Sequence, residues 1–167
     1  MRRPGAPRCG GRDTPSQPYD VKRLFYQIST TKFAGRSILS AEFVARETHA
    51  ASCDAREVQL WRTKRINSST TWNTETADGF WVDHHQTRSF AYGYDGCASK
   101  DAKFDVKAMV AEAASKKWPT ITFGMRATNE EDPCTWKRFS DSGGGVNVHA
   151  GGEEFARFMG RARRVYQ

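Results

Sequence analysis

The sequence predicts an all-β fold, an antiparallel jelly-roll-like β-sandwich with one short crossover helix. Residues 38–48 alternate apolar and polar side chains, which is the pattern of a strand with one buried face. Residues 105–117 form an amphipathic helical pattern, and a short apolar segment, residues 120–127, follows it directly. Aromatic residues make up 12% of the 167-residue chain, which favours sheets. One helix among short strands therefore indicates a sheet protein.

The strands predicted before the helix rest on β-rich runs and on period-two alternation. In residues 38–48, for example, Leu39, Ala41 and Phe43 share one face of the strand. Residues 74–86 are polar and predict a long exposed loop. The predicted strands are residues 21–28, 38–48, 57–63, 69–72 and 87–94.

The predicted helix has signals at both ends. Asp105 is its expected N-cap, because its carboxylate can accept hydrogen bonds from free amides of the first turn. Pro119 prevents the helix from continuing. So short a helix must gain its stability by docking on a sheet. Its apolar stripe is Val106, Met109, Val110 and Ala113. Strands are expected at residues 120–127 and 135–139, and after them only residues 146–148 look strand-like.

The length of the chain suits one domain, which we expect over residues 19–148. Residues 1–18 are rich in Pro, Gly and Arg and predict a disordered basic tail. Residues 149–167 form a second basic tail. The net charge of +7 is divided between the tails and the domain, since residues 21–148 hold 18 basic and 15 acidic side chains. Basic tails bind polyanions without specificity, and no nucleic-acid motif accompanies the charge.

The four cysteines lack the CxxC spacing of a zinc or redox site. Cys53 and Cys97 each follow a strand-like segment and lie in loop-like surroundings. A disulfide between them is plausible if the protein is exported, and the alternative is two free thiols in a cytosolic protein. We expect Cys9 to stay free in a flexible tail, and Cys134 has no obvious partner in the predicted strand order.

No residue pattern in the chain indicates catalysis, and no cofactor is predicted. His84, His85 and Asp83 are residue types that bind metals. Neighbouring residues on a strand point to opposite faces, however, so both imidazoles are not expected to bind one ion. The polarity of an exposed loop explains these residues better. The acidic residues 130–132 have the pattern of a solvated corner. With Asp141 they could offer oxygen ligands to structural calcium, but no calcium-loop pattern is present, so no metal site is predicted.

The aromatic residues divide into two groups. Trp72 and Phe139 lie where strands meet, which favours core packing. Trp61, Trp81 and Tyr92 could instead form a platform that stacks on sugar rings, with nearby Arg and Lys pairing with the carboxylates of an acidic sugar. The alternative for this trio is ordinary half-buried sheet aromatics.

Several segments occur in an order that is shared with a known family. The most specific stretch is FDVKAMVAEAASKKWPTITFGMRATNEED followed by TWKRF, and the supporting pieces are FAGRSILSAEFVARETHAASC, EVQLWRTKRINSSTTWN and AYGYDGC. Together they cover about residues 23–140, and they resemble the DNRLRE-type domain, as found in large secreted actinobacterial proteins that also carry laminin-G-like modules. The literal DNRLRE string is absent, so no binding residue is carried over from it.

The resemblance implies a jelly-roll-like sandwich without catalytic machinery, related to carbohydrate-binding modules, with Cys53 and Cys97 at the paired cysteine positions of the family. It implies a secreted or cell-surface location, although the N-terminus lacks the apolar segment of a signal peptide. The N-terminal residues and the segment after residue 140 depart from the family pattern. These departures suggest a fragment or a frame-altered end, which would leave a sheet edge open.

The function expected from these observations is that of a non-catalytic accessory module that binds polysaccharide, with a preference for acidic sugars. One alternative is a structural spacer domain without a ligand. Another is a basic cytosolic protein that binds nucleic acid through its tails. Membrane insertion is not expected, because no apolar run approaches the roughly 18 residues of a membrane span.

Overall fold

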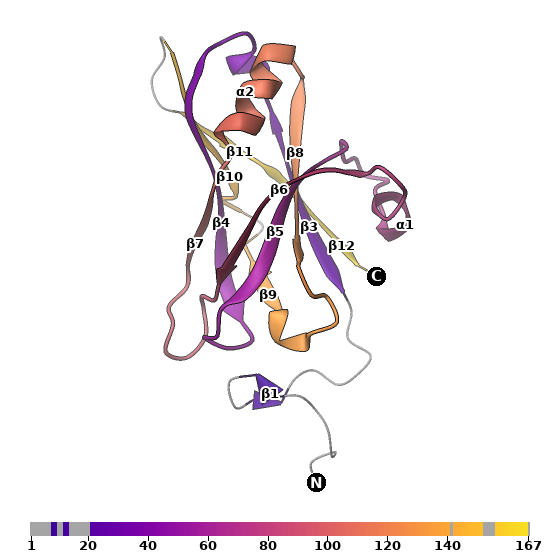
Figure 1. Cartoon of the computed structure of the whole chain (residues 1–167), viewed down its shortest axis with the longest axis vertical. Coiled ribbons are helices and arrows are strands. Elements are labelled where there is room, and N and C mark those ends of the chain that lie inside the picture. Colours follow the sequence, from indigo (N-terminus) through magenta and orange to yellow (C-terminus); the bar gives the residue numbers. More distant parts are fainter. Residues whose placement is uncertain (1–7, 10–11, 14–20, 141, 152–155, 167) are drawn as a thin grey trace.

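The chain folds as an antiparallel β-sandwich, as predicted, in a computed structural model that describes residues 8–9, 12–13, 21–140, 142–151 and 156–166 (Figure 1). The first sheet has the strand order β11 (Ala156–Met159), β10 (Gly145–Ala150), β4 (Ile38–Ala50) and β7 (Lys100–Asp105), and β9 (Lys137–Phe139) also pairs with β4. The second sheet has the order β12 (Arg161–Tyr166), β3 (Lys22–Ser29), β8 (Thr120–Ala127), β5 (Arg56–Thr63) and β6 (Trp81–Phe90).

The core lies between the two sheets, because every second residue of the central strands is apolar and points inward. Phe43 of β4 is fully buried, and its ring lies 5.4 Å from that of Tyr26 and 5.1 Å from that of Phe123, so the sheets meet around it. The inward residues of the first sheet include Ala41, Phe43, Ala45, Phe104, Val146 and Val148, and those of the second include Leu24, Tyr26, Ile28, Val58, Leu60, Ile121, Phe123 and Met125.

Helix α2 (Lys107–Lys116) carries the chain from β7 in the first sheet to β8 in the second and covers one end of the sandwich (Figure 1). It confirms the predicted crossover. The helix begins two residues later than predicted, and the N-cap is Val106, so the prediction of Asp105 as N-cap is wrong by one residue, although Asp105 Oδ1 accepts from the Lys107 amide at 3.0 Å. The helix ends at Lys116, and its C-cap, Lys117, has a left-handed φ of 53°. Met109, Val110 and Ala113 are buried as the stripe predicts.

Two predictions between residues 69 and 86 are wrong. Residues 69–72 are not a strand, because the Thr71 side chain caps the short helix α1 (Trp72–Glu75) in a capping box with Thr74. The expected loop over residues 74–86 contains the first half of β6. The sequence of β6 is polar and therefore does not show the alternation of a strand. Polar residues are accommodated because β6 is an edge strand, which pairs only with β5 and buries few of its side chains.

The C-terminal segment contributes more strands than residues 146–148 alone. The segment β12 pairs with β3 along its whole length, β11 pairs with β10, and the chain changes sheet at Gly160. The segment predicted as a basic tail, residues 149–167, therefore contributes two strands to the sheets. Both strands lie at sheet edges, where arginines are tolerated because one side of the strand remains in water. The strand β7 was missed for a similar reason, since only Ala102 and Phe104 of its residues are buried.

Three remaining elements complete the described chain. The short helices η1 (Thr31–Phe33) and η2 (Pro133–Thr135) lie in connections, and η2 replaces the first residue of the predicted strand 135–139. The strands β1 (Arg8–Cys9) and β2 (Arg12–Asp13) pair with each other. The prediction of disorder for residues 1–18 otherwise falls outside the described residues. None of the described helices is long and apolar enough to cross a membrane.

Candidate functional site

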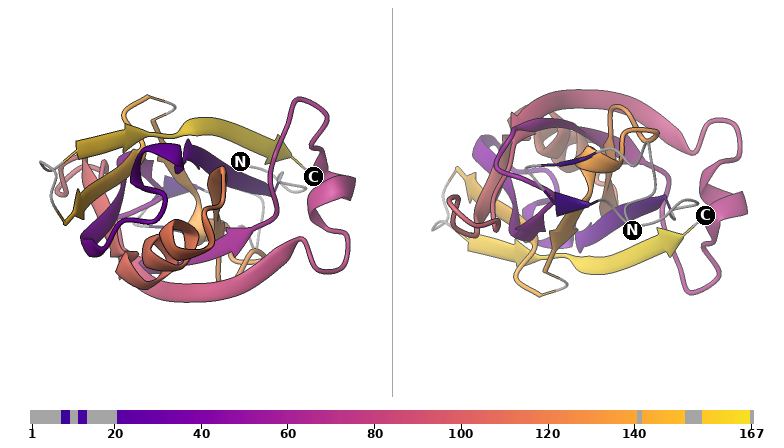
Figure 2. Two further views of the ribbon diagram at one scale, coloured as in Figure 1. Left: turned by 90° about the horizontal axis from the view of Figure 1, so that it is seen from above. Right: turned by 90° about the horizontal axis from the view of Figure 1, so that it is seen from below.

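The outer face of the second sheet is half covered. Residues 64–80, which include α1, pack over β3 and β12, and a small second core forms between Phe25, Ile66, Phe80 and Val165. Arg163 of β12 holds this cover in place by donating to the backbone oxygens of Ser68 and Thr70 at 3.0 and 2.7 Å. The end-on views show α1 projecting beside the C-terminal end of β12 (Figure 2). The outer face of β5, β6 and the end of β8 lies beyond this cover.

Trp61 is the centre of this part of the sheet. It lies on β5 between Arg126 of β8, whose guanidinium carbon is 4.6 Å from the indole centroid, and His84 of β6, whose ring centroid is 5.1 Å away. The Trp61 indole Nε1–H donates to Gln59 Oε1 at 2.9 Å, and Arg126 Nε donates to the same oxygen at 3.3 Å. Thr87 bonds His84 Nε2 at 2.9 Å. We call Gln59, Trp61, His84, Thr87 and Arg126 the Trp61 patch.

Trp81 borders the patch but is held by packing. Its ring meets that of Trp61 edge to face at 6.0 Å and lies 5.2 Å from the ring of Phe25. The indole Nε1–H of Trp81 donates to Glu75 Oε2 at 2.7 Å. Its ring also covers Gly124, where an added Cβ would come within 2.6 Å of Trp81 Cζ3. The contacts of Trp81 therefore include both the candidate patch and the second core.

A charge network supports the wall beside the patch. Arg23 donates to both carboxylate oxygens of the fully buried Glu75 at 2.9 Å, and it pairs with Glu130 at 2.6 Å. The guanidinium carbon of Arg23 also lies 4.4 Å from the ring centroid of Trp72, which packs against the second core as predicted. Charge-assisted hydrogen bonds of this kind fix side-chain geometry. Those to Glu75 anchor α1 to the sheet.

Arg126 is the half-buried cation of the patch. Burial lowers its pKa, and the positive charge of nearby Arg23 lowers the pKa further. Among the described residues no carboxylate lies within ion-pair distance of Arg126. The nearby carboxylates, Glu75 and Glu130, form their ion pairs with Arg23. A desolvated cation beside a like charge gains from a bound anion. The patch is therefore suited to a ligand that carries a negative charge.

Tyr92 lies elsewhere, so the structure brings together two of the three aromatic residues chosen from the sequence. Its ring stacks on Phe90 at 5.5 Å and packs against the main core, and the Lys100 ammonium lies 5.6 Å from the centroid. Sequence reasoning missed Gln59, His84 and Arg126. Period-two spacing places Gln59 on the same face as Trp61, but only the strand register brings Arg126 beside them.

The disulfide between Cys53 and Cys97 is present, which confirms the predicted pair. It joins the loop after β4 to the loop before β7. Cys134 is also disulfide-bonded, so the prediction that it lacks a partner is wrong. The bond was missed because the predicted strand order placed no other cysteine near residue 134. The prediction for Cys9 concerns a side chain outside the described part of the chain.

The candidate metal ligands have other partners. His84 faces Trp61, whereas His85 Nε2 contacts the backbone oxygen of Asp105, so the two imidazoles point apart as expected, on a strand and not on a loop. Asp132 accepts from the Cys134 amide at 2.9 Å and pairs with Arg56 at 3.4 Å. Asp141 lies outside the described residues. Among those described, no group of three or more His, Cys, Asp or Glu side chains could hold a metal ion.

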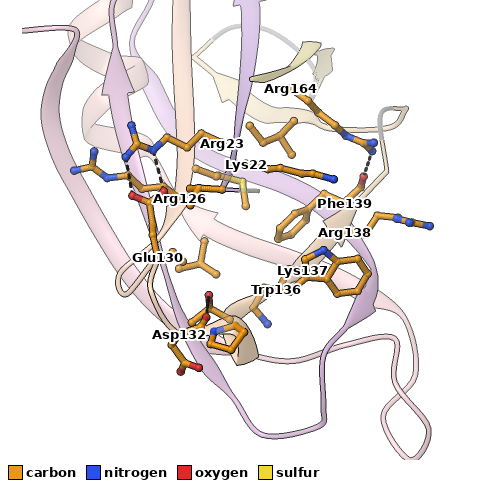
Figure 3. Close-up of a pocket in the computed structure, with 17 residues that line it drawn as sticks. Lys22, Arg23, Arg126, Glu130, Asp132, Trp136, Lys137, Arg138, Phe139 and Arg164 are labelled. Atoms are coloured by element: carbon orange, nitrogen blue, oxygen red, sulfur yellow. Dashed lines mark hydrogen bonds and ion pairs between the residues drawn. The ribbon is translucent and has the colours of Figure 1, made fainter. Parts of the chain in front are cut away.

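A cavity of about 320 Å³ opens at the end of the sandwich opposite α2 (Figure 3). Its floor is apolar and its wall is rich in cations. Sequence reasoning did not find it, because the residues that line it come from β3, β5, β8, β9 and β12 and from the η2 connection. Arg126 of the Trp61 patch also lines it, so the cavity and the patch adjoin each other at β8.

The chain was also compared with known proteins. No family model matches it, and no curated protein matches it either. The resemblance to the DNRLRE-type domain therefore stays a prediction that rests on the quoted segments.

Proposed function

We propose that this chain is a non-catalytic accessory module of a secreted or cell-surface bacterial protein, and that it binds polysaccharide through the Trp61 patch. The observation that carries the proposal is the set of planar polar groups around Trp61: an amide, a guanidinium and an imidazole within one outer sheet face. Such groups can form hydrogen bonds with the hydroxyl groups of a sugar. The aromatic rings beside them offer apolar faces to the C–H groups of the sugar ring. The resemblance to a DNRLRE-type domain supports the same function.

The preference for acidic polysaccharides follows from Arg126. Its charge has no carboxylate partner among the described residues, and a uronate carboxylate could take two parallel hydrogen bonds from its guanidinium. Arg126 Nε already donates to Gln59, so the Nη groups are the donors that face a ligand. A neutral glycan would keep the hydroxyl contacts and lose this ion pair.

The non-catalytic part of the proposal rests on how the nearby carboxylates are used. General acid–base chemistry requires a carboxyl group that is able to exchange a proton with the substrate. Glu75 is buried beneath Arg23 and Trp81, and Glu130 is paired with Arg23. Each of these acids therefore has a structural role beside the patch. The disulfide of Cys53 with Cys97 agrees with an oxidising location.

The test is calorimetric titration of the full chain with a polyuronate and with a neutral glucan of similar length. We expect a dissociation constant in the micromolar-to-millimolar range for the polyuronate, equivalent to about 4–8 kcal/mol. Trp61→Ala should weaken binding about tenfold, equivalent to about 1.4 kcal/mol. Arg126→Gln should remove the preference for the charged glycan. Trp136→Ala is the control, because it removes an exposed tryptophan at the end cavity and leaves the patch intact.

Three outcomes would contradict the proposal. Flat titrations with both glycans would favour a structural spacer without a ligand. Release of reducing ends from either polysaccharide would contradict the absence of catalysis. Salt-sensitive binding to DNA, with no glycan binding, would instead favour nucleic-acid binding through the basic termini.

A further inference from the structure

The end cavity is a recess of the main core that reaches the surface. Four buried side chains form its floor, two from the central strands β3 and β8 and one each from β5 and β9. The η2 connection forms the opposite wall. The floor residues are Leu24, Val58, Met125 and Phe139. A volume of about 320 Å³ with an apolar floor matches the lower end of small-molecule sites.

Cations line both sides of this cavity, and Arg23 and Arg126 lie on the side of Glu130. Figure 3 shows Lys22, Arg138 and Arg164 beside β9, with Trp136 next to Arg138. The guanidinium carbon of Arg138 lies 5.7 Å from the ring centroid of Trp136, and the exposed Arg138 side chain has no carboxylate within ion-pair distance among the described residues. Arg164 donates to the backbone oxygen of Phe139 at 2.8 Å.

The carboxylates of the cavity lie on the other wall and are neutralised there. Glu130 pairs with Arg23 at 2.6 Å, and Asp132 pairs with Arg56 at 3.4 Å. Lys137, deeper in the cavity, pairs with buried Glu47 at 3.1 Å. The lining therefore holds more cations than carboxylates, and three of these cations, Lys22, Arg138 and Arg164, are exposed.

We infer that this cavity is a second binding site, which takes a small amphipathic carboxylate: an aromatic or branched aliphatic body rests on Leu24, Val58, Met125 and Phe139, and the carboxylate faces Arg138. The apolar floor would contact the apolar body of such a molecule, and the cations of the lining would attract its carboxylate. An extended, hydroxyl-rich polysaccharide does not suit the apolar floor, so this cavity takes a different class of ligand from the Trp61 patch, with which it shares Arg126. Trp136 adds an aromatic edge at the mouth.

The experiment uses 2-naphthoate as the probe and its neutral analogue 2-naphthamide as the charge control, with calorimetric titration of the full oxidised chain. We expect naphthoate to bind more tightly than naphthamide by about fivefold, since one exposed charge-assisted contact separates them. Arg138→Gln should remove this preference and keep naphthamide binding. Lys107→Gln, which removes an exposed cation at the α2 end of the sandwich, should change neither affinity.

A second variant tests the location. Ala127 lines the cavity from the end of β8 and is half-buried, so Ala127→Phe should fill the recess and abolish the binding of both probes. If Ala127→Phe fails to fold by circular dichroism, Thr135→Trp fills the cavity from the η2 side. Trp61→Ala should leave naphthoate binding unchanged.

Three results would overturn the inference. The first is the absence of binding by either probe, the second is equal affinity for the acid and the amide, and the third is full binding by the cavity-filling variants. The glycan titrations with Trp61→Ala test the Trp61 patch separately, because Trp61 does not line the cavity and Arg126, the patch residue that does, is not varied here.

Discussion

Glu47 and Lys137 form a buried ion pair between β4 and β9. The side chain of Glu47 is fully buried, and Lys137 Nζ lies 3.1 Å from Glu47 Oε1 and also donates to the backbone oxygen of Phe90. The Tyr92 amide donates to the other carboxylate oxygen at 3.2 Å. Burial raises the pKa of Glu47 to about 7, and the pairing with Lys137 only partly offsets this rise. Burial likewise lowers the pKa of Lys137. The pair fixes β9 at a cost in desolvation.

The first prediction is a pH dependence of stability that comes from Glu47. Between its ordinary pKa of 4.5 and about 7, the folded chain keeps a proton that the unfolded chain has released. Because the native state then binds more protons, the free energy of unfolding should fall as pH rises through this window, by on the order of 3 kcal/mol. Urea unfolding between pH 4.5 and 7.5 measures it.

The control for this prediction is Glu47→Gln, which keeps an acceptor for the Tyr92 amide and for Lys137 but cannot titrate. Its stability should vary less with pH over the same window, because a glutamine side chain cannot take up the proton that the folded wild type keeps. Equal slopes for the wild type and this variant would show that another group causes the dependence.

Gly124 is the residue that lets Trp81 lie flat on β8. An added Cβ would come within 2.6 Å of Trp81 Cζ3 and 2.7 Å of Thr63 Cγ2. Gly124→Ala should therefore displace the indole, break its hydrogen bond to Glu75 and cost about 1–3 kcal/mol of unfolding free energy, as overpacking does. Chemical denaturation is the measurement. Gly151→Ala is the matched control, because its Cβ would make only ordinary contacts of 3.6 Å.

At the scale of elements, the loops that follow β4 and precede β7 are joined by Cys53 and Cys97, which are 44 residues apart. In the chain-entropy model a disulfide over this separation contributes about 4 kcal/mol. The double variant Cys53→Ala/Cys97→Ala should therefore lose about 3–4 kcal/mol of unfolding free energy and keep the sandwich. Thermal unfolding and far-ultraviolet circular dichroism test both parts.

Variants are preferable to reduction in this test. A reductant would also open the disulfide of Cys134, and the two contributions would be mixed. An unchanged melting temperature in the double variant would mean that hydrogen bonds such as that of the Gly93 amide to the Cys97 oxygen, 2.8 Å, hold this region without the covalent link.

How well each element could be predicted depends on how much of it is buried. The strand β8 has the predicted bounds, residues 120–127, because Ile121, Phe123 and Met125 supply an unbroken apolar face. The edge strands β6, β7 and β12 bury few side chains, so their sequences carry charges that read as loop or tail. The side chains of His85 and Arg88 on β6 contact backbone oxygens of β7, a contact between strands of different sheets that no local pattern encodes.

Some residues of the candidate site could be predicted from the sequence and others could not. Trp61 and Trp81 could be chosen from the sequence because tryptophans in polar strands are unusual, and the structure places them 6.0 Å apart. Arg126 could not be chosen, since its place beside Gln59 depends on the register of β5 with β8, 67 residues away along the chain. Tyr92 was chosen on the same grounds as the tryptophans, but its ring stacks on Phe90 away from the patch.

At the scale of the whole molecule, the sandwich presents two unlike sites. The outer face of the second sheet offers polar planar groups around Trp61, and the end of the core offers a recess with an apolar floor and a lining rich in cations. The sheets are closed at one side by β11 and β12, which pair with β10 and β3. The C-terminal strands therefore belong to the fold that positions the sites.

The central claim is that the Trp61 patch binds an acidic polysaccharide, and the most direct measurement is an NMR titration of the indole N–H signals of the five tryptophans with a uronate oligomer. The indole donors of Trp61 and Trp81 bond Gln59 and Glu75, so both signals report on the patch and its wall. We predict saturable shifts of these two signals, with those of Trp118 and Trp136 unchanged. Shifts confined to Trp136, or no shift at any tryptophan, would contradict the account.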